Sequence, residues 1–273
     1  YIAALAEPEI LDFTAATDDR PFFFNQLKLS RIFDYLQRDK QGVLLGNLNA
    51  TLTLALILVL ATIAAILAIV IPLHRTIKGI NRKYLASGSL YFMLIGFGFM
   101  FAEIALLQKL GLFLGHPIYG LSVGLAGLIF SSGLGSYLTH REILHTPFGF
   151  VIWVLLTAGT LISAPWWLTY ALNTGQLYAE PTRIAVALFI VMPIGLLLGF
   201  GMPTGLQIIK KLDDRPSAWF WGLNGVAGVL ASVLAILISI HAGISVNLYL
   251  ASICYVLLGF PYLYWHILLK RAL

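Results

Sequence analysis

The stretch "TLTLALILVLATIAAILAIVIPL", Thr51 to Leu73, decides the fold class because it contains no charged residue. An α-helix needs about 20 consecutive apolar residues to cross a bilayer. A strand of an outer-membrane barrel instead alternates apolar and polar side chains with period two. The stretch therefore predicts a transmembrane helix, and the fold class that we expect is all-α, a polytopic helical membrane bundle.

The composition of the whole chain indicates the same class. Of its 273 residues, 59% are hydrophobic and 11% are charged, and the mean hydropathy is +0.89. Soluble domains carry about 25% charged residues. A net charge of +5 is typical of cytoplasmic loops that meet anionic lipid, so we expect the lipid bilayer as a partner and no nucleic acid. The single cysteine, Cys254, excludes a disulfide within the chain.

Further apolar segments follow the first along the chain. With it they predict about seven transmembrane helices, at residues 51–73, 86–108, 118–139, 147–170, 182–207, 218–240 and 243–267. Residues 47–273 are therefore expected to form the transmembrane bundle.

The chain before this bundle divides into two parts. Residues 1–20 are acidic and soluble in character and read as the end of a preceding domain. Residues 21–46 predict an interfacial amphipathic helix and a linker, with Asp19 as the N-cap and Pro21 in the first turn. Over residues 21–38 the apolar side chains recur on one face and the charged side chains on the other.

Glycines occur at the spacing that allows helices to approach closely in lipid, where small residues form the contacts. We expect this packing within the bundle, with a dimerisation motif as the alternative. The candidate packing positions are Gly120, Gly124, Gly195, Gly199, Gly225 and Gly228.

Glu103 is the only acid inside a predicted span, and an ionisable residue there marks a functional site or a paired charge. Three interpretations remain open: a carboxylate paired with a basic group, a proton or cation site, or a neutral acid that hydrogen-bonds to the backbone. Gln108 and Lys109 follow near the end of the same helix, where Lys109 can extend to the interface or reach a partner.

Other polar residues are candidates for binding or capping. His116, before Pro117, either titrates near neutral pH or caps a helix. Asn224 is expected to hydrogen-bond across helices, and Pro203 to kink the fifth span. In "DDRPFFF", Asp18, Asp19 and Arg20 either mark a boundary or, as the minority interpretation, contribute to a catalytic site. No motif assigns a catalytic residue, a cofactor or a metal ion.

Several phrases in this order resemble the C-terminal membrane portion of bacterial spermidine-synthase-like (aminopropyltransferase-like) multi-spanning membrane proteins. They are "ATDDRPFFFNQL", "YFMLIGFGFMFAEIALLQKLGLFLGHPIYGLSVGLAGLIFSSGLGS", "GLLLGFGMPTGLQ" and "WFWGLNGVAGVLASVLAILISIHAGIS", within residues 16–27 and 91–245. The resemblance implies that a catalytic domain binding S-adenosylmethionine precedes such a bundle. None of that domain's residues occurs here, so the resemblance implies an anchor and not aminopropyl transfer by this chain.

Three functions follow from these observations. The first is a non-catalytic anchor or scaffold in the bacterial inner membrane, with a preceding soluble domain. The second is a transporter of small molecules or cations of the polyamine type, and the third is an accessory subunit of a larger membrane complex. More Lys and Arg residues flank the spans on the C-terminal side, which favours a cytoplasmic C-terminus.

Overall fold

The computed structural model describes residues 15–22, 27–28, 45–139, 146–175 and 177–272. Residues 15–22 and 27–28 are not helical, the other ranges are almost entirely helical, and seven of the described helices are long and apolar enough to cross a membrane. The predicted all-α membrane bundle is thereby confirmed. The spans are Thr51–Leu73, Arg82–Leu114, Pro117–Leu138, Pro147–Gly175, Glu180–Leu212, Ser217–Ala242 and Ile244–Leu269.

Four spans are single helices and three are divided. The single helices are α5 (Arg82–Leu114), α6 (Pro117–Leu138), α7 (Pro147–Gly175) and α10 (Ser217–Ala242). The first span consists of α3 (Leu45–Ala65), a π-helical turn and α4 (Ile71–Leu73). The fifth consists of α8 (Glu180–Gly199) and α9 (Gly201–Leu212), and the seventh of α11 (Ile244–Leu257) and α12 (Gly259–Ala272).

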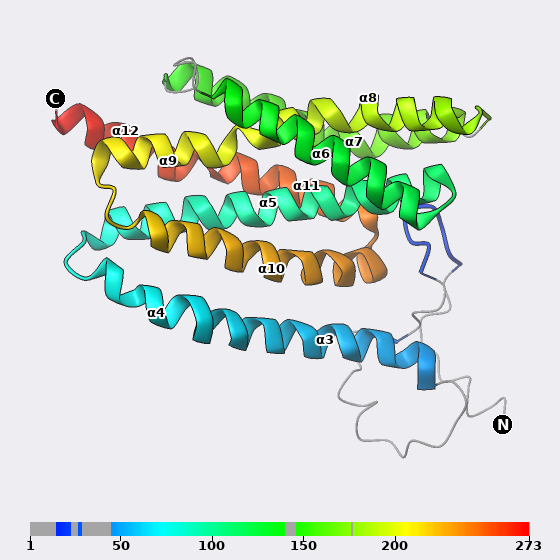
Figure 1. Cartoon of the computed structure of the whole chain (residues 1–273), viewed down its shortest axis with the longest axis horizontal. Helices are drawn as coiled ribbons and strands as arrows, with labels where there is room; N and C mark the ends of the chain where they lie inside the picture. The colour runs from blue at the N-terminus through cyan, green and yellow to red at the C-terminus, as the bar shows by residue number, and fades with distance from the viewer. Residues whose placement is uncertain (1–14, 23–26, 29–44, 140–145, 176, 273) are drawn as a thin grey trace.

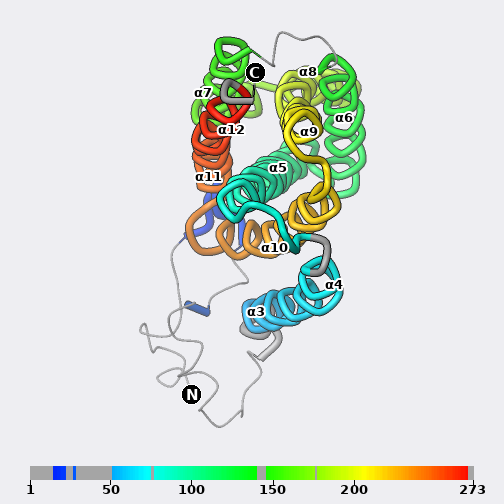
Figure 2. Tube along the Cα trace, turned by 90° about the vertical axis from the view of Figure 1, so that its left-hand side faces the viewer, coloured from blue at the N-terminus to red at the C-terminus, as the bar shows by residue number. Residues whose placement is uncertain are grey.

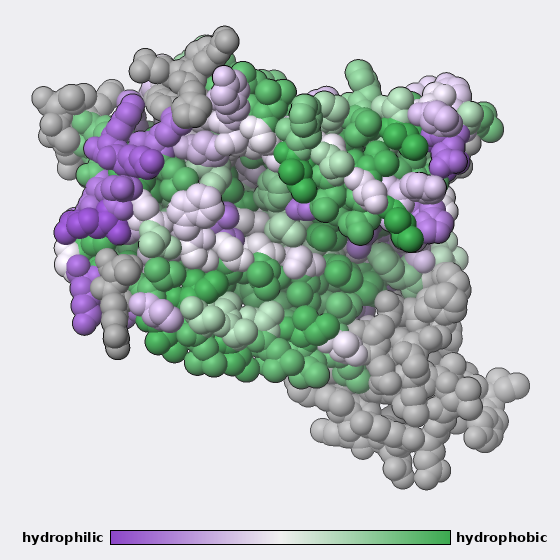
Figure 3. Space-filling view, in the orientation of Figure 1, coloured by the Kyte–Doolittle hydropathy of each residue, from purple (hydrophilic) through white to green (hydrophobic). Residues whose placement is uncertain are grey.

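Helix α5 is the central element of the bundle. Figures 1 and 2 show it surrounded by the other spans, with α10 on one side and α6, α9 and α11 on others. Helices α3 and α4 lie outermost and pack on α10 (Figure 2). Large side chains of α3, such as Leu56 and Leu60, are exposed, as expected of a helix that faces lipid. On the face shown in Figure 3, the surface over α3 and α4 is mostly green, that is, hydrophobic.

Aromatic side chains fill the core around the first half of α5. The rings of Phe92 and Phe220 stack with centroids 5.3 Å apart, and Tyr91 meets Trp265 at 4.9 Å. All four side chains are fully buried. Such pairs stabilise by about 0.5–1.5 kcal/mol beyond their burial, so this cluster connects α5 to α10 and α12.

The predicted close packing at glycines occurs at two interfaces. On the interface of α5 and α6, a Cβ at Gly120 would collide with the backbone of Gly111, and one at Gly124 with the Leu107 side chain. On the interface of α6 and α8, Gly195 and Gly199 leave no room for a Cβ beside α6. The backbones of these helices therefore pack closely through small residues, as helices do in lipid.

Gly225 and Gly228 of α10 differ from this expectation. A Cβ at Gly225 would meet nothing within 4 Å, and one at Gly228 would make only an ordinary contact with Met100, at 3.5 Å. Packing within the chain does not require a glycine at either position. Both line a cleft that is described below.

The fifth span is interrupted at Phe200, between α8 and α9, three residues before Pro203. The missing N–H of proline weakens the helix there. Two buried side chains donate hydrogen bonds to carbonyls beside the interruption: Trp153 Nε1 to Leu197 O at 2.8 Å, and Tyr91 Oη to Gly201 O at 2.9 Å. The predicted break is present and is held by these two aromatic residues.

The prediction that an interfacial helix starts at Pro21 is wrong. Pro21 and Phe22 are not helical, and neither are Leu27 and Lys28. The reason is that Asp19, expected to cap a helix beginning at Pro21, makes its hydrogen bonds to another helix. Most of the expected helix, residues 23–26 and 29–38, lies outside the described residues.

Candidate functional site

Asp19 caps the N-terminus of α11, although 226 residues separate it from Ser245. Its backbone carbonyl accepts the Ile244 N–H at 2.8 Å, and its carboxylate accepts the Ser245 N–H at 3.0 Å and the Ser245 hydroxyl at 2.5 Å. The first N–H groups of a helix have no partner within the helix, and a carboxylate there also interacts favourably with the helix dipole. Asp19 therefore satisfies two orphan donors at once.

The same carboxylate pairs with Lys109, near the end of α5. The Lys109 Nζ atom donates to Asp19 Oδ1 at 2.7 Å, with the lysine side chain 6% and the aspartate side chain 38% exposed. Burial raises the pKa of Asp19, but the hydrogen bonds from Lys109 and Ser245 and the charge of Lys109 outweigh it, so the pKa lies below the ordinary 3.8. The expectation that Lys109 extends to a partner is confirmed.

Arg20 contacts the preceding helix end. Its Nε donates to Ile240 O in the last turn of α10 at 3.4 Å, where a cation suits the negative end of the helix dipole. Gly243 then turns the chain from α10 into α11 at φ +105°, and a side chain there would collide with the Asp19 carboxylate. Glycine is thus required both by the backbone and by the approach of Asp19.

We call Asp19, Arg20, Lys109 and Ser245 the clamp, because they join segment 15–22 to α5, α10 and α11. The segment itself turns at Asp18 and Asp19 between two hydrogen bonds that pair Thr17 with Arg20. Asp18 is exposed at this turn. The clamp binds a stretch of chain outside the spans to three helix ends of the bundle.

A second polar group lies next to the clamp, deeper between the same helices. The Ser239 hydroxyl donates to Gln108 Oε1 at 2.6 Å, and Asn247 Nδ2 donates to Ser239 Oγ at 2.8 Å and to Ala235 O at 3.0 Å. Ser239 and Asn247 are fully buried, and Asn247 Oδ1 has no hydrogen-bond partner among the residues that the structure describes. Interhelical hydrogen bonds of this kind are worth about 0.6 kcal/mol each in lipid.

The remaining candidates lie apart from the clamp or do not contact it. His116 is exposed and caps α6, its Nδ1 accepting the Ile118 N–H at 3.3 Å, in agreement with the capping interpretation. Glu103 is half-buried on α5, and no hydrogen bond or ion pair joins it to any residue in the described part of the chain. The interpretations as a carboxylate paired with a basic group and as an acid bonded to backbone therefore find no partner among those residues.

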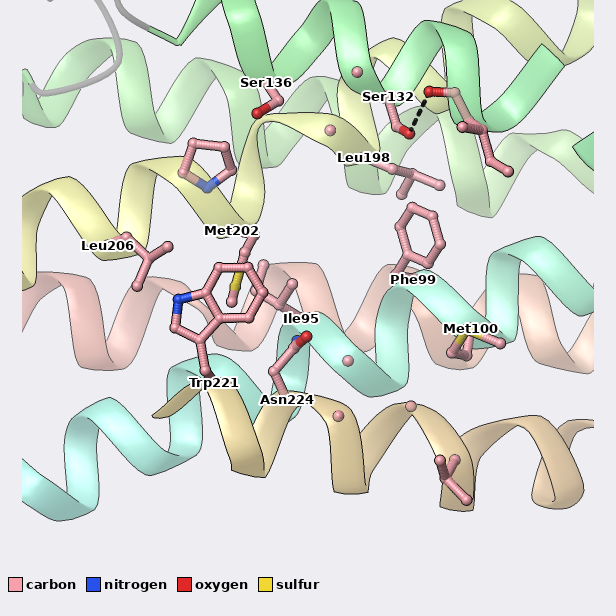
Figure 4. Close-up of a pocket in the computed structure, with 18 of the residues that line it drawn as sticks. Ile95, Phe99, Met100, Ser132, Ser136, Leu198, Met202, Leu206, Trp221 and Asn224 are labelled. Carbon is pink, nitrogen blue, oxygen red and sulfur yellow. Dashed lines mark hydrogen bonds between the residues drawn. The ribbon is translucent and has the colours of Figure 1, made fainter. Parts of the chain in front are cut away.

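Asn224 lies in a cleft of about 920 Å³ that opens on the side of the bundle. Its Nδ2 donates to Phe92 O at 3.0 Å, which confirms the predicted bond across helices. Figure 4 shows α5 as the floor, with Ile95 and Phe99, between Trp221 and Asn224 of α10 and Ser132 and Ser136 of α6. Met202 and Leu206 of α9 close one end.

Sequence reasoning identified Asp19, Arg20, Gln108 and Lys109 but missed their partners. Ser239, Ser245 and Asn247 look like ordinary small polar residues in "SIHAGISVN". The available signal was Gly243, which ends one apolar run and begins the next, so that the following N–H groups need an acceptor.

The clamp can bind, orient and hold charge: its one hydroxyl, that of Ser245, donates to the Asp19 carboxylate, which also pairs with Lys109 and caps α11. Among the described residues, no group of three or more His, Cys, Asp or Glu side chains could hold a metal ion. Comparisons with protein-family models, with curated proteins and with solved structures found no match.

Proposed function

We propose that this chain is a non-catalytic integral membrane module, an anchor or scaffold that fixes a soluble domain or partner subunit at the membrane surface. The observation that carries the proposal is the clamp. Its residues Asp19 and Arg20 lie outside the spans, yet they bond to the ends of α10 and α11 and to Lys109 of α5. A segment held in this way transmits position from the bundle to whatever adjoins it.

The resemblance to spermidine-synthase-like membrane proteins supports the same proposal. The phrase "ATDDRPFFFNQL" that contributes to it contains the two clamp residues Asp19 and Arg20. In that family the phrase follows a soluble aminopropyltransferase-like domain. The clamp would then set the height and orientation of this domain above the inner membrane, and the accessory-subunit interpretation is the same proposal with a separate partner chain.

Native mass spectrometry of the protein extracted from its own membranes tests this function. We expect a mass above the 30.0 kDa of this chain, from a covalently joined soluble domain or from a stoichiometric subunit. If the excess mass is a separate subunit, Asp19→Ala, which removes the clamp, should release it; a covalently joined domain would stay attached but become more mobile relative to the bundle. Isolation of the 30.0 kDa chain alone, under conditions that preserve other membrane complexes, would contradict the proposal.

A cation transporter is the second candidate, and the observation that favours it is Glu103, which is half-buried and has no partner among the described residues. Carboxylates at membrane depth bind cations or relay protons in transporters, and the break at Phe200 provides a discontinuous helix whose residues Gly199 and Met202 line the cleft that contains Asn224. Proteoliposomes would then take up a labelled polyamine, and Glu103→Gln would reduce this uptake at least tenfold. Uptake that is absent, or unchanged by the substitution, removes this candidate.

A further inference from the structure

The cleft on the side of the bundle is larger than a packing defect and opens toward lipid. Its volume is about 920 Å³, within the range of about 300–1,000 Å³ that is usual for small-molecule pockets. It follows α10 from Trp221 to Ser232, a length of about 16 Å at 1.5 Å per residue. Its lining is mostly apolar, with the Asn224 amide and the hydroxyls of Ser132, Ser136 and Ser232 as the polar exceptions.

Two of the glycines on its walls have no packing role in the described part of the chain. A Cβ at Gly225 of α10 or at Gly133 of α6 would meet nothing within 4 Å. By contrast, Gly96 and Gly199, which line the same cleft, are packed against backbone of a neighbouring helix. Gly133 and Gly225 therefore keep the cleft wide, since leucine at either position would fill it.

Glu103 lies on α5 one helical turn beyond Phe99 and Met100, the last residues of this helix that line the cleft. It follows Phe99 by four residues and Met100 by three, so it shares their face of α5. Side chains in an α-helix lean toward the helix N-terminus, which directs the Glu103 carboxyl back toward Phe99 and Met100. The carboxyl is half-buried, and no described residue pairs with it.

We propose that this cleft is a binding site for an elongated apolar molecule with a single protonated amine, its chain between α6 and α10 and its ammonium on Glu103. An uncompensated carboxylate is costly at membrane depth, and a cation from the ligand offsets that cost. The apolar walls bury the chain, and the open side admits it from the bilayer. The site goes beyond the anchoring function and does not depend on it.

Quenching of Trp221 fluorescence in lipid nanodiscs tests the site. The probe is hexadecylamine brominated near the end of its chain, and the matched neutral probe is the equally brominated hexadecanol. Subtracting the signal of Trp221→Phe isolates the tryptophan that lines the cleft. We expect the amine to quench at about tenfold lower concentration than the alcohol, and Glu103→Gln to remove that difference.

Two glycine variants provide the steric control. Gly225→Leu fills the cleft and should abolish quenching by both probes. Gly159→Leu makes the same change on α7, where a Cβ also meets nothing within 4 Å, and should leave quenching unchanged. Equal quenching in the wild type and in Glu103→Gln would overturn the proposal, because the cleft would then bind only an alkyl chain.

The oligomeric state tests whether a second copy of the chain, and not an amine, fills the cleft. If Gly225→Leu lowers the mass of the particle measured by light scattering, the cleft is a contact between copies of the chain and the proposal fails. The two proposals can fail independently. Amine-selective quenching without polyamine uptake would overturn the transport candidate alone. Polyamine uptake without amine-selective quenching would overturn the binding site alone.

Discussion

Asp19 shows how one residue can complete a membrane fold from outside the spans. Its carbonyl and carboxylate accept three hydrogen bonds at the start of α11. The carboxylate also pairs with the buried Lys109. Without Asp19, both the helix N-terminus and the lysine would lack a partner. Leaving one member of a buried pair without its counter-charge costs about 3–5 kcal/mol, and the 38% exposure of Asp19 reduces this toward about 2 kcal/mol.

The lowered pKa of Asp19 predicts how its contribution depends on pH. Because the folded pKa lies below the unfolded 3.8, the carboxylate stabilises the fold fully above that value. This stabilisation is lost as the pH falls through the folded pKa. We expect wild type to exceed Asp19→Asn in the free energy of unfolding by about 2 kcal/mol near neutral pH.

Denaturant titrations in detergent, repeated from neutral to acidic pH, measure this difference. The gap between wild type and Asp19→Asn should stay constant down to about pH 5 and close below pH 3.8. A gap that already closes near pH 6, or one that widens in acid, would show that the clamp does not depend on an ionised Asp19.

At the scale of elements, the interface between α6 and α8 depends on glycines that the backbone of the neighbouring helix covers. A Cβ at Gly199 would collide with the Ser132 backbone, and one at Gly135 with the Leu196 carbonyl. Backbone cannot move aside as a flexible side chain can. The same α6 helix also presents Gly133 to open space, which offers a comparison within one element.

Replacing Gly135 by alanine should therefore destabilise the protein, while the same change at Gly133 should not. Overpacking costs about 1–3 kcal/mol, and alanine in place of glycine gains up to about 1 kcal/mol of helix propensity. Thermal unfolding in detergent should show a lower Tm for Gly135→Ala and an equal or higher Tm for Gly133→Ala. Equal shifts in the two variants would contradict the assigned interface.

The elements themselves could be predicted from the sequence, because runs of apolar residues such as 51–73 are long enough to span a bilayer and lack charge. The Asn224 bond and the break near Pro203 followed from residue chemistry. The partner of Asp19 could not be predicted, because local capping at Pro21 satisfies the same rule as capping α11 from a distance. Helix neighbours are set by tertiary packing, which span composition does not encode.

At the scale of the molecule, an odd number of spans places the two ends of the bundle's chain on opposite sides of the membrane. Seven spans separate the clamp from the C-terminal end of α12. Lys210, Lys211 and Arg215 lie on the C-terminal side, and the positive-inside rule favours the cytoplasm for such residues. The clamp and any domain attached to it would then face the opposite side.

Labelling of single cysteines tests this orientation. In a Cys254→Ser background, Asp214→Cys and Tyr178→Cys place exposed thiols at opposite ends of the bundle. We expect a membrane-impermeant maleimide added outside the membrane that holds the protein to label position 178 and not position 214. The reverse pattern would put the clamp on the cytoplasmic side.

The ion pair of Asp19 and Lys109 attaches segment 15–22 to the bundle, and a double-mutant cycle at these two residues measures its strength directly. The free energy of unfolding in detergent is compared for wild type, Asp19→Asn, Lys109→Met and the double variant. A coupling energy of about 1–2 kcal/mol in favour of the pair is predicted, since the two side chains are in contact. Single-variant effects that add to within about 0.3 kcal/mol would contradict the clamp.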